Sequence, residues 1–600
     1  MKRALSCTVL ALLLWGCSDS PSEPKVATTV VVTPGSVTFD AVGATKVVHA
    51  SVKDQKGGSM SGVALSWSSS SPAATVVGAG GDSAVVTAAA NGTASISAST
   101  GTVAGAAAVQ VAQVATVIEK ASGDQQTGTV GAALPVQVRV RILDRLGSPV
   151  AGQSVTFAVT QGGGTLSPTT AVTGADGGAA TTWTLGTGMG TPQAVSATLQ
   201  GAALGAVTFS ATAVAGPAAT VAPNGGSGQG GMAGTALPTS PSVVVRDAGG
   251  LPLAGRTVTF AVTGGGGSVT GATATTNASG VATVGSWVLG PQAGLNQLTA
   301  TVSGTGVADN PVIFGAVGCQ GGGGAGYAIT LCYTTPMTPA QRGVFENAAA
   351  RWGGLITGDV LDVAAAIPGG SCGEGSPSLD LNFDDLVIFA GVEDIDGPGS
   401  ILGQAGWCFR RTGSLPILGL MRFDAADVAA LEADGRLGDV ILHEMGHVLG
   451  IGSMWSTLGL LQNPSTASSV LDTHFSGTNG IAGFDAIGGT TYTGGLKVPV
   501  ENTGGSGTFN AHWRESVLAN ELMTGWLDTG TAHPLSLLTV RSLADLGYTV
   551  NTAAADGFFL TLSVRAPGGT TPRGLRLEND EWKGPRYTID RQGRRTRVGQ

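Results

Sequence analysis

The sequence predicts a multidomain protein in which three all-β sandwich modules precede one α+β domain. Residues 27–316 are poor in charged and aromatic side chains, and apolar residues there alternate with small polar ones, as strands with one buried face require. A strand pattern recurs inside this region at a long, fixed spacing. Residues 317–555 instead carry helical apolar periodicity and five of the six histidines of the chain.

The β region divides into three modules. The pattern Val155–Thr160 recurs as Val258–Thr263, an offset of 103 residues, and Trp183 and Trp287 follow nearly in step. A period of about one hundred residues with about seven short strands is typical of immunoglobulin-like (Ig-like) sandwiches. The modules resemble bacterial Ig-like domains of adhesins and surface enzymes. We expect them at residues 27–112, 113–215 and 216–316.

The first seventeen residues resemble the signal of an exported bacterial lipoprotein. Lys2 and Arg3 precede an apolar run, residues 4–15, that is too short to span a bilayer. Cys17 closes the signal and is the expected lipidation site, and residues 18–26 form a polar tether. A plain secretory signal is the alternative. We therefore expect a protein of the bacterial cell envelope, lipid-anchored (at the outer membrane) or secreted if the anchor is absent.

The segment from His443 to Gly450 carries two metal-ligand side chains and a base on one helical turn. His443 and His447 are four residues apart, so on a helix they share a face and can bind one Zn²⁺. Glu444 lies beside the first ligand, where it can take a proton from a metal-bound water. Apolar residues on both sides predict a buried helix, and Gly450 marks its end.

A catalytic zinc site of this kind needs a third protein ligand. Ser453 stands where a compact version of the motif would place a histidine, so the ligand must come from further along the chain. His512 is the expected ligand. Four other candidate ligands remain open: a histidine in a loop, a histidine before a proline, and two glutamates. The second glutamate could instead be a structural acid that fixes a turn. The four candidates are His474, His533, Glu515 and Glu521.

Residues of about 317–555 resemble the leishmanolysin family of zinc metallopeptidases. The resemblance rests on His443, Glu444, His447 and Gly450, then on His512-Trp513 after a long insertion, and on Glu521-Leu522-Met523. It implies a metzincin-like α+β fold, one catalytic zinc ion, endopeptidase activity on proteins or peptides, and a methionine turn at Met523 under the metal.

The expected reaction is hydrolysis of a peptide bond. Zinc held by three neutral imidazoles lowers the pKa of a bound water, and Glu444 accepts its proton as general base. Leu415–Phe423 is predicted to be a strand. It is either the upper edge of the cleft, where a substrate strand would add by main-chain hydrogen bonds, or an ordinary buried strand.

Cysteine usage agrees with export to an oxidising compartment. Beyond the signal, the chain has four cysteines, and we expect Cys319–Cys332 and Cys372–Cys408 among the three possible pairings. The leishmanolysin resemblance implies an inhibitory cysteine in a propeptide. Because no cysteine lies between Cys17 and Cys319, latency by that route would require Cys319.

The net charge and the C-terminal residues limit the possible functions of the protein. A net charge of −9 argues against nucleic-acid binding. Residues 556–600 form a basic C-terminal extension, expected to be a solvated tail or a small β element.

The alternative to an anchored peptidase on a spacer stalk is a surface adhesin whose Ig-like modules bind a ligand and whose peptidase domain is incidental. A closed, structural zinc site is a third interpretation, which Glu444 beside an open coordination position disfavours.

Overall fold

The computed structural model describes residues 23–188, 192–321, 326–413, 415–505, 507–528, 531–560, 574–577 and 579–599. The predicted signal, Cys17 and most of the tether lie outside these ranges. The chain forms two compact units, Met1–Gly216 and Pro217–Gln600. Within the described ranges, each helix is too short or too polar to cross a membrane.

The first module is a sandwich of two sheets. Its strands are β1 (Ala27–Thr33), β2 (Ser36–Phe39), β3 (Thr45–Asp54), β4 (Ser59–Met60), β5 (Ser66–Ser69), β6 (Ala74–Gly80), β7 (Ser83–Ala88), β8 (Gly92–Thr100) and β9 (Val103–Val111). One sheet has the order β1-β3-β7-β6 with β4 on β3, and the other the order β2-β9-β8-β5. Exposed and buried residues alternate along β3 and β8, so each sheet buries one face.

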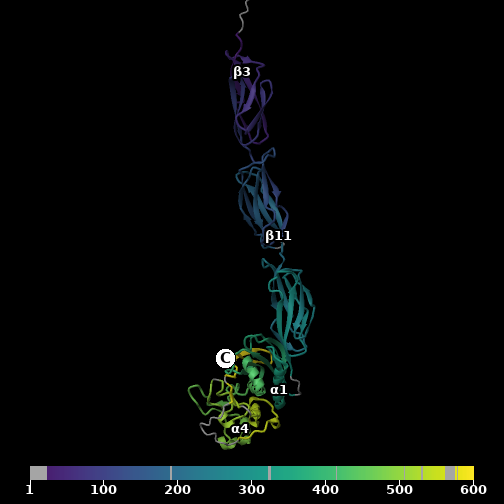
Figure 1. Ribbon diagram of the computed structural model, residues 1–600, viewed down its shortest axis with the longest axis vertical. Helices are drawn as coiled ribbons and strands as arrows, with labels where there is room; N and C mark the ends of the chain where they lie inside the picture. Colours follow the sequence, from purple (N-terminus) through teal and green to yellow (C-terminus); the bar gives the residue numbers. More distant parts are fainter. Residues whose placement is uncertain are drawn as a thin grey trace, which may run out of the picture. The chain divides into compact units, whose positions relative to one another are not determined.

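The second module repeats this plan, as the ribbon around β3 and β11 shows (Figure 1). Its strands are β10 (Val117–Ser122), β11 (Gln126–Thr129), β12 (Val138–Leu143), β13 (Ser154–Gln161), β14 (Thr165–Ser167), β15 (Thr170–Val172), β16 (Gly178–Thr184), β17 (Gln193–Leu199) and β18 (Val207–Val214). The two sheets are β10-β12-β16-β14 and β11-β18-β17-β13-β15.

The third module belongs to the second unit. Its strands are β19 (Ala218–Gly225), β20 (Gln229–Met232), β21 (Ser242–Asp247), β22 (Thr257–Gly264), β23 (Ser268–Thr270), β24 (Thr273–Thr275), β25 (Val281–Thr283), β26 (Ser286–Val288), β27 (Gly294–Val302) and β28 (Val312–Gln320). The repeat seen in the sequence is a structural one. Trp183 and Trp287 are both fully buried, and the hydroxyls of Thr173 and Thr276 donate to equivalent backbone carbonyls.

The α+β domain is built on a sheet that continues from the third module. Its main strands are β29 (Ile329–Tyr333), β30 (Val363–Ile367), β31 (Ser378–Phe383), β32 (Leu386–Glu393), β33 (Gly403–Arg411), β34 (Pro416–Asp424), β40 (Arg586–Ile589) and β41 (Arg595–Gly599). The order runs β28-β29-β32-β34-β33-β40-β41. Strands β29, β32 and β34 are parallel, whereas β33 is antiparallel to β34. The expected module boundary at 316/317 falls inside β28.

Helices and short strands complete the domain. They are α1 (Pro339–Leu355), α2 (Ala425–Ala433), α3 (Leu437–Leu449), β35 (Leu461–Gln462), β36 (His474–Phe475), α4 (Thr478–Phe484), the π-helix η1 (Asp485–Gly489), α5 (Thr490–Thr493), β37 (Val498–Pro499), α6 (Glu515–Leu518), β38 (Trp526–Leu527), α7 (Leu537–Leu546), the 3₁₀ helix η2 (Thr552–Ala554) and β39 (Leu575–Arg576). Three all-β modules followed by an α+β domain confirm the predicted fold class.

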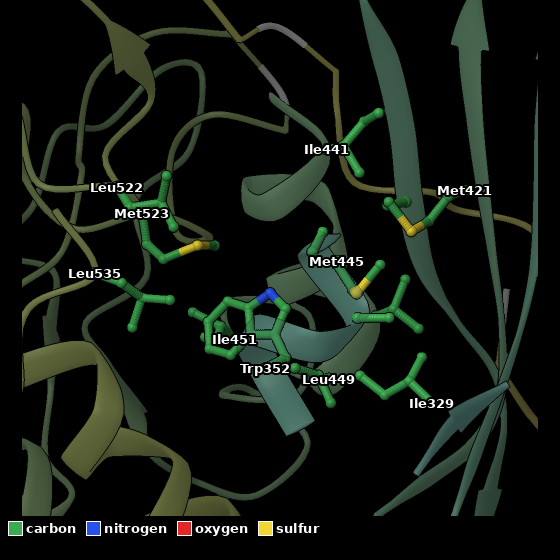
Figure 2. Close-up of a cluster of buried hydrophobic side chains, with 14 of the residues drawn as sticks. Ile329, Trp352, Met421, Ile441, Met445, Leu449, Ile451, Leu522, Met523 and Leu535 are labelled. Atoms are coloured by element: carbon green, nitrogen blue, oxygen red, sulfur yellow. The ribbon is translucent and has the colours of Figure 1, made fainter. Parts of the chain in front are cut away.

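One buried cluster joins the helices to the sheet. Figure 2 shows Trp352 of α1 with Met445 and Leu449 of α3, Met421 of β34 and Met523 of the loop after α6. Trp352 donates its indole N–H to the carbonyl of Leu442 at 3.0 Å, which fixes α1 against α3. Helix α3 is therefore anchored on both sides, and its position is set by packing rather than by exposed contacts.

Of the two expected forms of the C-terminal extension, the structure shows the small β element and not the solvated tail. Strands β40 and β41 extend the main sheet, and Trp582 and Ile589 are buried in a cluster with residues of β33 and β34. Residues 574–577 and 579–599 are thus part of the α+β domain, which does not end near residue 555.

Gly450 is expected to be required for the end of α3. Its φ of 111° is strained for any residue with a Cβ, and a Cβ there would lie 2.8 Å from the Met454 sulfur. We expect Gly450→Ala to destabilise the domain by about 1–3 kcal/mol. Calorimetric unfolding of the full chain checks this. Gly438→Ala on the same helix, where a Cβ is freely accommodated, is the control and should cost nothing. Equal stability of the two variants would contradict the assignment.

Candidate metal site

Helix α3 places two imidazoles side by side. His443 and His447 both have an exposed fraction of 0%, and their Nε2 atoms lie 3.0 Å apart. The four-residue spacing puts them on one helical face. The turn at Gly450 returns the chain over the end of the helix, so that the carbonyl of Ile451 lies 2.9 Å from Nδ1 of His447.

His512 reaches the same point from a distant loop. Its Nε2 lies 3.1 Å from Nε2 of both helix histidines, and its side chain is fully buried. The neighbouring Trp513 holds this loop by donating its indole N–H to the hydroxyl of Thr539 at 2.7 Å. The structure brings His443, His447 and His512 together.

The rival ligands lie elsewhere. Nδ1 of His533 pairs with Asp439 at 2.8 Å, and Nδ1 of His474 lies 2.7 Å from the carbonyl of Asp472. The Glu521 carboxylate accepts hydrogen bonds from the backbone N–H of Met523 in its own turn and from the hydroxyl of Ser536. The group of acidic and histidine side chains that converges with His443 includes neither these residues nor Glu515.

Hydrogen bonds fix the protonation of the three imidazoles. Nδ1 of His443 lies 2.7 Å from the carbonyl of Leu522, and Nδ1 of His512 lies 2.9 Å from that of Thr508. Nδ1 of His447 likewise faces the carbonyl of Ile451. Because a carbonyl oxygen only accepts hydrogen bonds, each Nδ1 carries the proton. In a neutral imidazole the Nε2 then presents a bare lone pair. Three lone pairs converging on one point are a cation site.

The dimensions suit zinc. The three Nε2 atoms form a triangle with sides of 3.0–3.1 Å. A tetrahedral zinc ion with Zn–N bonds of about 2.0–2.1 Å separates its nitrogens by about 3.3 Å. A small relaxation of the side chains therefore accommodates the ion. The donor set of three imidazoles also suits zinc over calcium or magnesium, which prefer oxygen.

A fourth side chain at the site was not predicted from the sequence. Asp580 is buried, and its Oδ2 lies 2.9 Å from Nε2 of His512, 3.7 Å from that of His443 and 3.9 Å from that of His447. It precedes β40 in the C-terminal extension. A single aspartate in a polar stretch carries no spacing signal, so only the folded chain reveals it.

Burial and the charges of neighbouring side chains together set the pKa values of the site. Burial lowers the pKa of His447 to about 3, helped by the neighbouring His443 and His512. Burial would raise the pKa of Asp580, but the imidazoles beside it, His512 foremost, hold it well below the usual value. The pKa of Glu444 is raised by burial and then by the charge of Asp580. A bound cation would act on Glu444 in the opposite direction.

Met523 closes the floor of the site. A Cβ at Gly446 would lie 2.8 Å from the Met523 sulfur, so α3 and the methionine turn pack in direct contact (Figure 2). Glu521 shapes that turn. Its carboxylate accepts the backbone N–H of Met523 at 2.7 Å and the hydroxyls of Ser536 and Thr539 at 2.7 and 2.5 Å. Glu521 is thus the structural acid of the turn.

Residues 415–423 were predicted to be either the upper edge of a substrate cleft or an ordinary buried strand. The structure agrees with the buried strand. This segment forms β34, which pairs on both sides, with β32 and β33, and is therefore an internal strand. Strand β33 pairs with β34 on one side, and on its other side it pairs with β40 and bonds the residues that precede β40. Asp580 itself lies against that other side, because the Ala405 N–H donates to its carbonyl at 2.7 Å.

Two disulfides flank the sheet. Cys319 of β28 bonds Cys332 of β29, and Cys372 bonds Cys408 of β33. The first links the third module to the α+β domain, and the second ties a loop to β33. Because Cys319 is bonded, it is not available as an inhibitory thiolate.

Comparison with known proteins identifies the family that this part of the chain resembles. Residues 376–561 match the family model for leishmanolysin, a span that includes the three histidines and Glu444 and ends before Asp580. A leishmanolysin homolog from Crithidia fasciculata is 28% identical over 177 residues, 28% of this chain and 25% of that protein. The chain thus matches about a quarter of that relative's length. The predicted leishmanolysin resemblance is confirmed.

Among solved structures, the Escherichia coli adhesin FdeC covers 49% of this chain and 99% of its own, with 20% identity and a TM-score of 0.29. Invasin, described as a bacterial integrin-binding protein, covers 49% of this chain and 60% of its own, with 16% identity and a TM-score of 0.32.

Glu521 is expected to stabilise the domain through the methionine turn. Glu521→Gln replaces one acceptor oxygen with a donor that faces other donors, so we expect a loss of about 1–3 kcal/mol of unfolding free energy. Thermal unfolding of the full chain measures it. Glu374→Gln, at an exposed carboxylate of the same domain, is the matched control. If both variants melted together with the wild type, Glu521 would not hold the turn.

Proposed function

We propose that the α+β domain is a zinc metalloendopeptidase, in which His443, His447 and His512 hold the ion. The observation that carries the proposal is the convergence of three bare Nε2 atoms within 3.1 Å, beside a buried glutamate. A metal ion of this kind supplies a Lewis acid that polarises the peptide carbonyl and acidifies a water molecule.

Glu444 is the proposed proton carrier. It follows His443 on α3, and neither of its carboxylate oxygens accepts a hydrogen bond within the described part of the chain. A structural carboxylate at this depth would be paired. Glu444 is therefore free to take a proton from the attacking water and to pass it to the leaving amide nitrogen.

An extended polypeptide is the substrate that the edge of β33 suits. The edge of β33 already binds backbone: the Ala405 N–H donates to the Asp580 carbonyl at 2.7 Å, and the Trp582 N–H donates to the Ala405 carbonyl at 2.8 Å. Main-chain bonding of this type selects for a strand-like peptide and not for its sequence. Proteins or peptides are the proposed substrates.

The proposed location is the cell envelope. Two disulfides are typical of a protein that folds in an oxidising compartment. Cys17, the proposed lipid attachment site, lies outside the described residues. The Ig-like modules are proposed to be a spacer stalk, and their binding of a surface ligand stays a prediction.

Metal content tests the ligand set. We expect full-length wild type to bind one zinc ion and His512→Ala to lose it, because two imidazoles on α3 leave the coordination incomplete. His474→Ala, which removes a histidine of the insertion loop, should keep the ion. Elemental analysis after dialysis gives the stoichiometry. Zinc retained by His512→Ala, or lost from His474→Ala, would refute this ligand set.

Removal of the base tests the chemistry. We expect Glu444→Gln to bind zinc as wild type does and to lower hydrolysis of casein or gelatin by at least about a hundredfold, because general-base catalysis contributes that much or more. Both properties are measured on the same purified full-length samples. Unchanged hydrolysis by Glu444→Gln would show that the activity arises elsewhere.

A further inference from the structure

We propose that the C-terminal segment, residues 574–577 and 579–599, is a built-in inhibitor of the metal site and that Asp580 is the fourth ligand of the ion. The proposal rests on the proposed function and extends it to regulation. It starts from the carboxylate of Asp580, which lies within 2.9–3.9 Å of all three Nε2 atoms.

Among the described residues, the partners of the Asp580 carboxylate are the imidazoles of the metal site. Asp580 has an exposed fraction of 1%, and apart from the imidazoles, neither of its oxygens has a hydrogen-bond donor among the described residues. A buried carboxylate without donors costs several kcal/mol unless a positive charge lies beside it. A divalent cation between Asp580 and the three imidazoles supplies that charge and completes a four-coordinate, closed site.

The segment is held by β33. Besides the two backbone bonds between Ala405 and the segment, the Gln404 side chain donates to the carbonyl of Asn579 at 2.8 Å. Further along, β40 pairs with β33 in parallel, and Tyr587 stacks on Phe409 with ring centroids 4.8 Å apart. The segment occupies the edge that a peptide substrate would need.

The loops around His512 and the methionine turn hold the segment as well. Leu577 donates its N–H to the carbonyl of Gly525 at 3.1 Å, and its own carbonyl accepts the Thr508 hydroxyl at 3.1 Å. Thr508 also provides the carbonyl that orients His512. Strand β39 pairs with β38, directly after the methionine turn. The segment is therefore bonded both to β33 and to the loops around His512 and the methionine turn, and the Asp580 carboxylate lies at the metal ligands.

Buried side chains show that the segment is a packed part of the domain. Trp582 is 5% exposed and Ile589 is 1% exposed. The Arg586 guanidinium lies 4.8 Å from the centre of the Trp407 ring and donates to Glu581 at 2.8 Å. These contacts place Asp580 with the precision that a metal ligand needs. The segment thus occupies both the fourth ligand position of the metal and the edge of β33 that a substrate would use.

The test compares full-length wild type, Asp580→Ala and Asp590→Asn. Asp590 lies in the same segment, at the turn between β40 and β41, and serves as the matched control. Each protein is loaded with Co²⁺, whose visible absorption reports coordination, and is titrated with azide. Metal affinity is measured by competition with a chelator, folding by thermal unfolding, and hydrolysis with casein.

In the wild type and Asp590→Asn, azide should shift the Co²⁺ spectrum far less than in Asp580→Ala, because Asp580 holds the fourth ligand position in most molecules and only a small open fraction hydrolyses casein. In Asp580→Ala, the spectrum should shift with azide, the metal dissociation constant should rise at least tenfold, and casein hydrolysis should rise at least tenfold. Weaker metal binding with faster hydrolysis separates inhibition from a structural role, which would lower both affinity and activity.

An azide response and metal affinity in Asp580→Ala equal to those of wild type would overturn the proposal. So would a wild-type site that is open and azide-sensitive in most molecules. If Asp580→Ala unfolds early, Asp580→Asn, which keeps the shape of the side chain, replaces it with the same expectations at smaller magnitude. A changed spectrum and affinity without any hydrolysis would support Asp580 as the ligand and refute the proposed peptidase function instead.

Discussion

The geometry of the site depends on three hydrogen bonds that orient imidazoles. Each Nδ1 faces a backbone carbonyl, and these carbonyls come from Leu522, Ile451 and Thr508. Because all three are acceptors, the lone pairs of all three Nε2 atoms point inward. The methionine turn, the reversal after α3 and the loop before His512 each contribute one carbonyl, so the surrounding fold has to be complete before the site exists.

The packing below the site serves the same end. Gly446 allows the Met523 sulfur to touch the helix, Glu521 holds the methionine turn, and Trp352 locks α1 onto α3. The environment is dry enough that the charges of Asp580 and Glu444 interact strongly. A domain arranged in this way binds an ion as an integral part of its core, and the C-terminal segment then determines whether the remaining ligand position is open.

Much of this could be predicted from the sequence, because the relevant residues carry a local spacing. The four-residue interval between His443 and His447 defines a helical face, Gly450 shows where the helix must end, and alternation in residues 27–316 predicts strands. The repeat at 103 residues predicts sandwiches of equal size. Trp183 and Trp287 recur at nearly the same interval, and both are buried in their modules.

What could not be predicted depends on contacts between distant segments. The strand proposed to bind substrate is β33 and not 415–423. The sequence could not show this, because the order of strands in a sheet depends on tertiary contacts. Asp580 lies in a polar stretch beyond the residues that match the leishmanolysin family. The basic residues around β41 favour a solvent-exposed segment over one that enters the metal site. The Asp580 carboxylate reaches the histidines only because Leu577 is bonded to Thr508 and Trp582 is bonded to Ala405.

Anomalous diffraction at the zinc absorption edge, from a crystal of the full-length protein purified without chelators, tests the central claim most directly. We predict one peak at bonding distance, about 2.0–2.2 Å, from Nε2 of His443, His447 and His512 and from a carboxylate oxygen of Asp580. A zinc-replete crystal with no peak among the three imidazoles would contradict the metal site. A peak there with Asp580 turned away and water in its place would contradict the inhibitory segment.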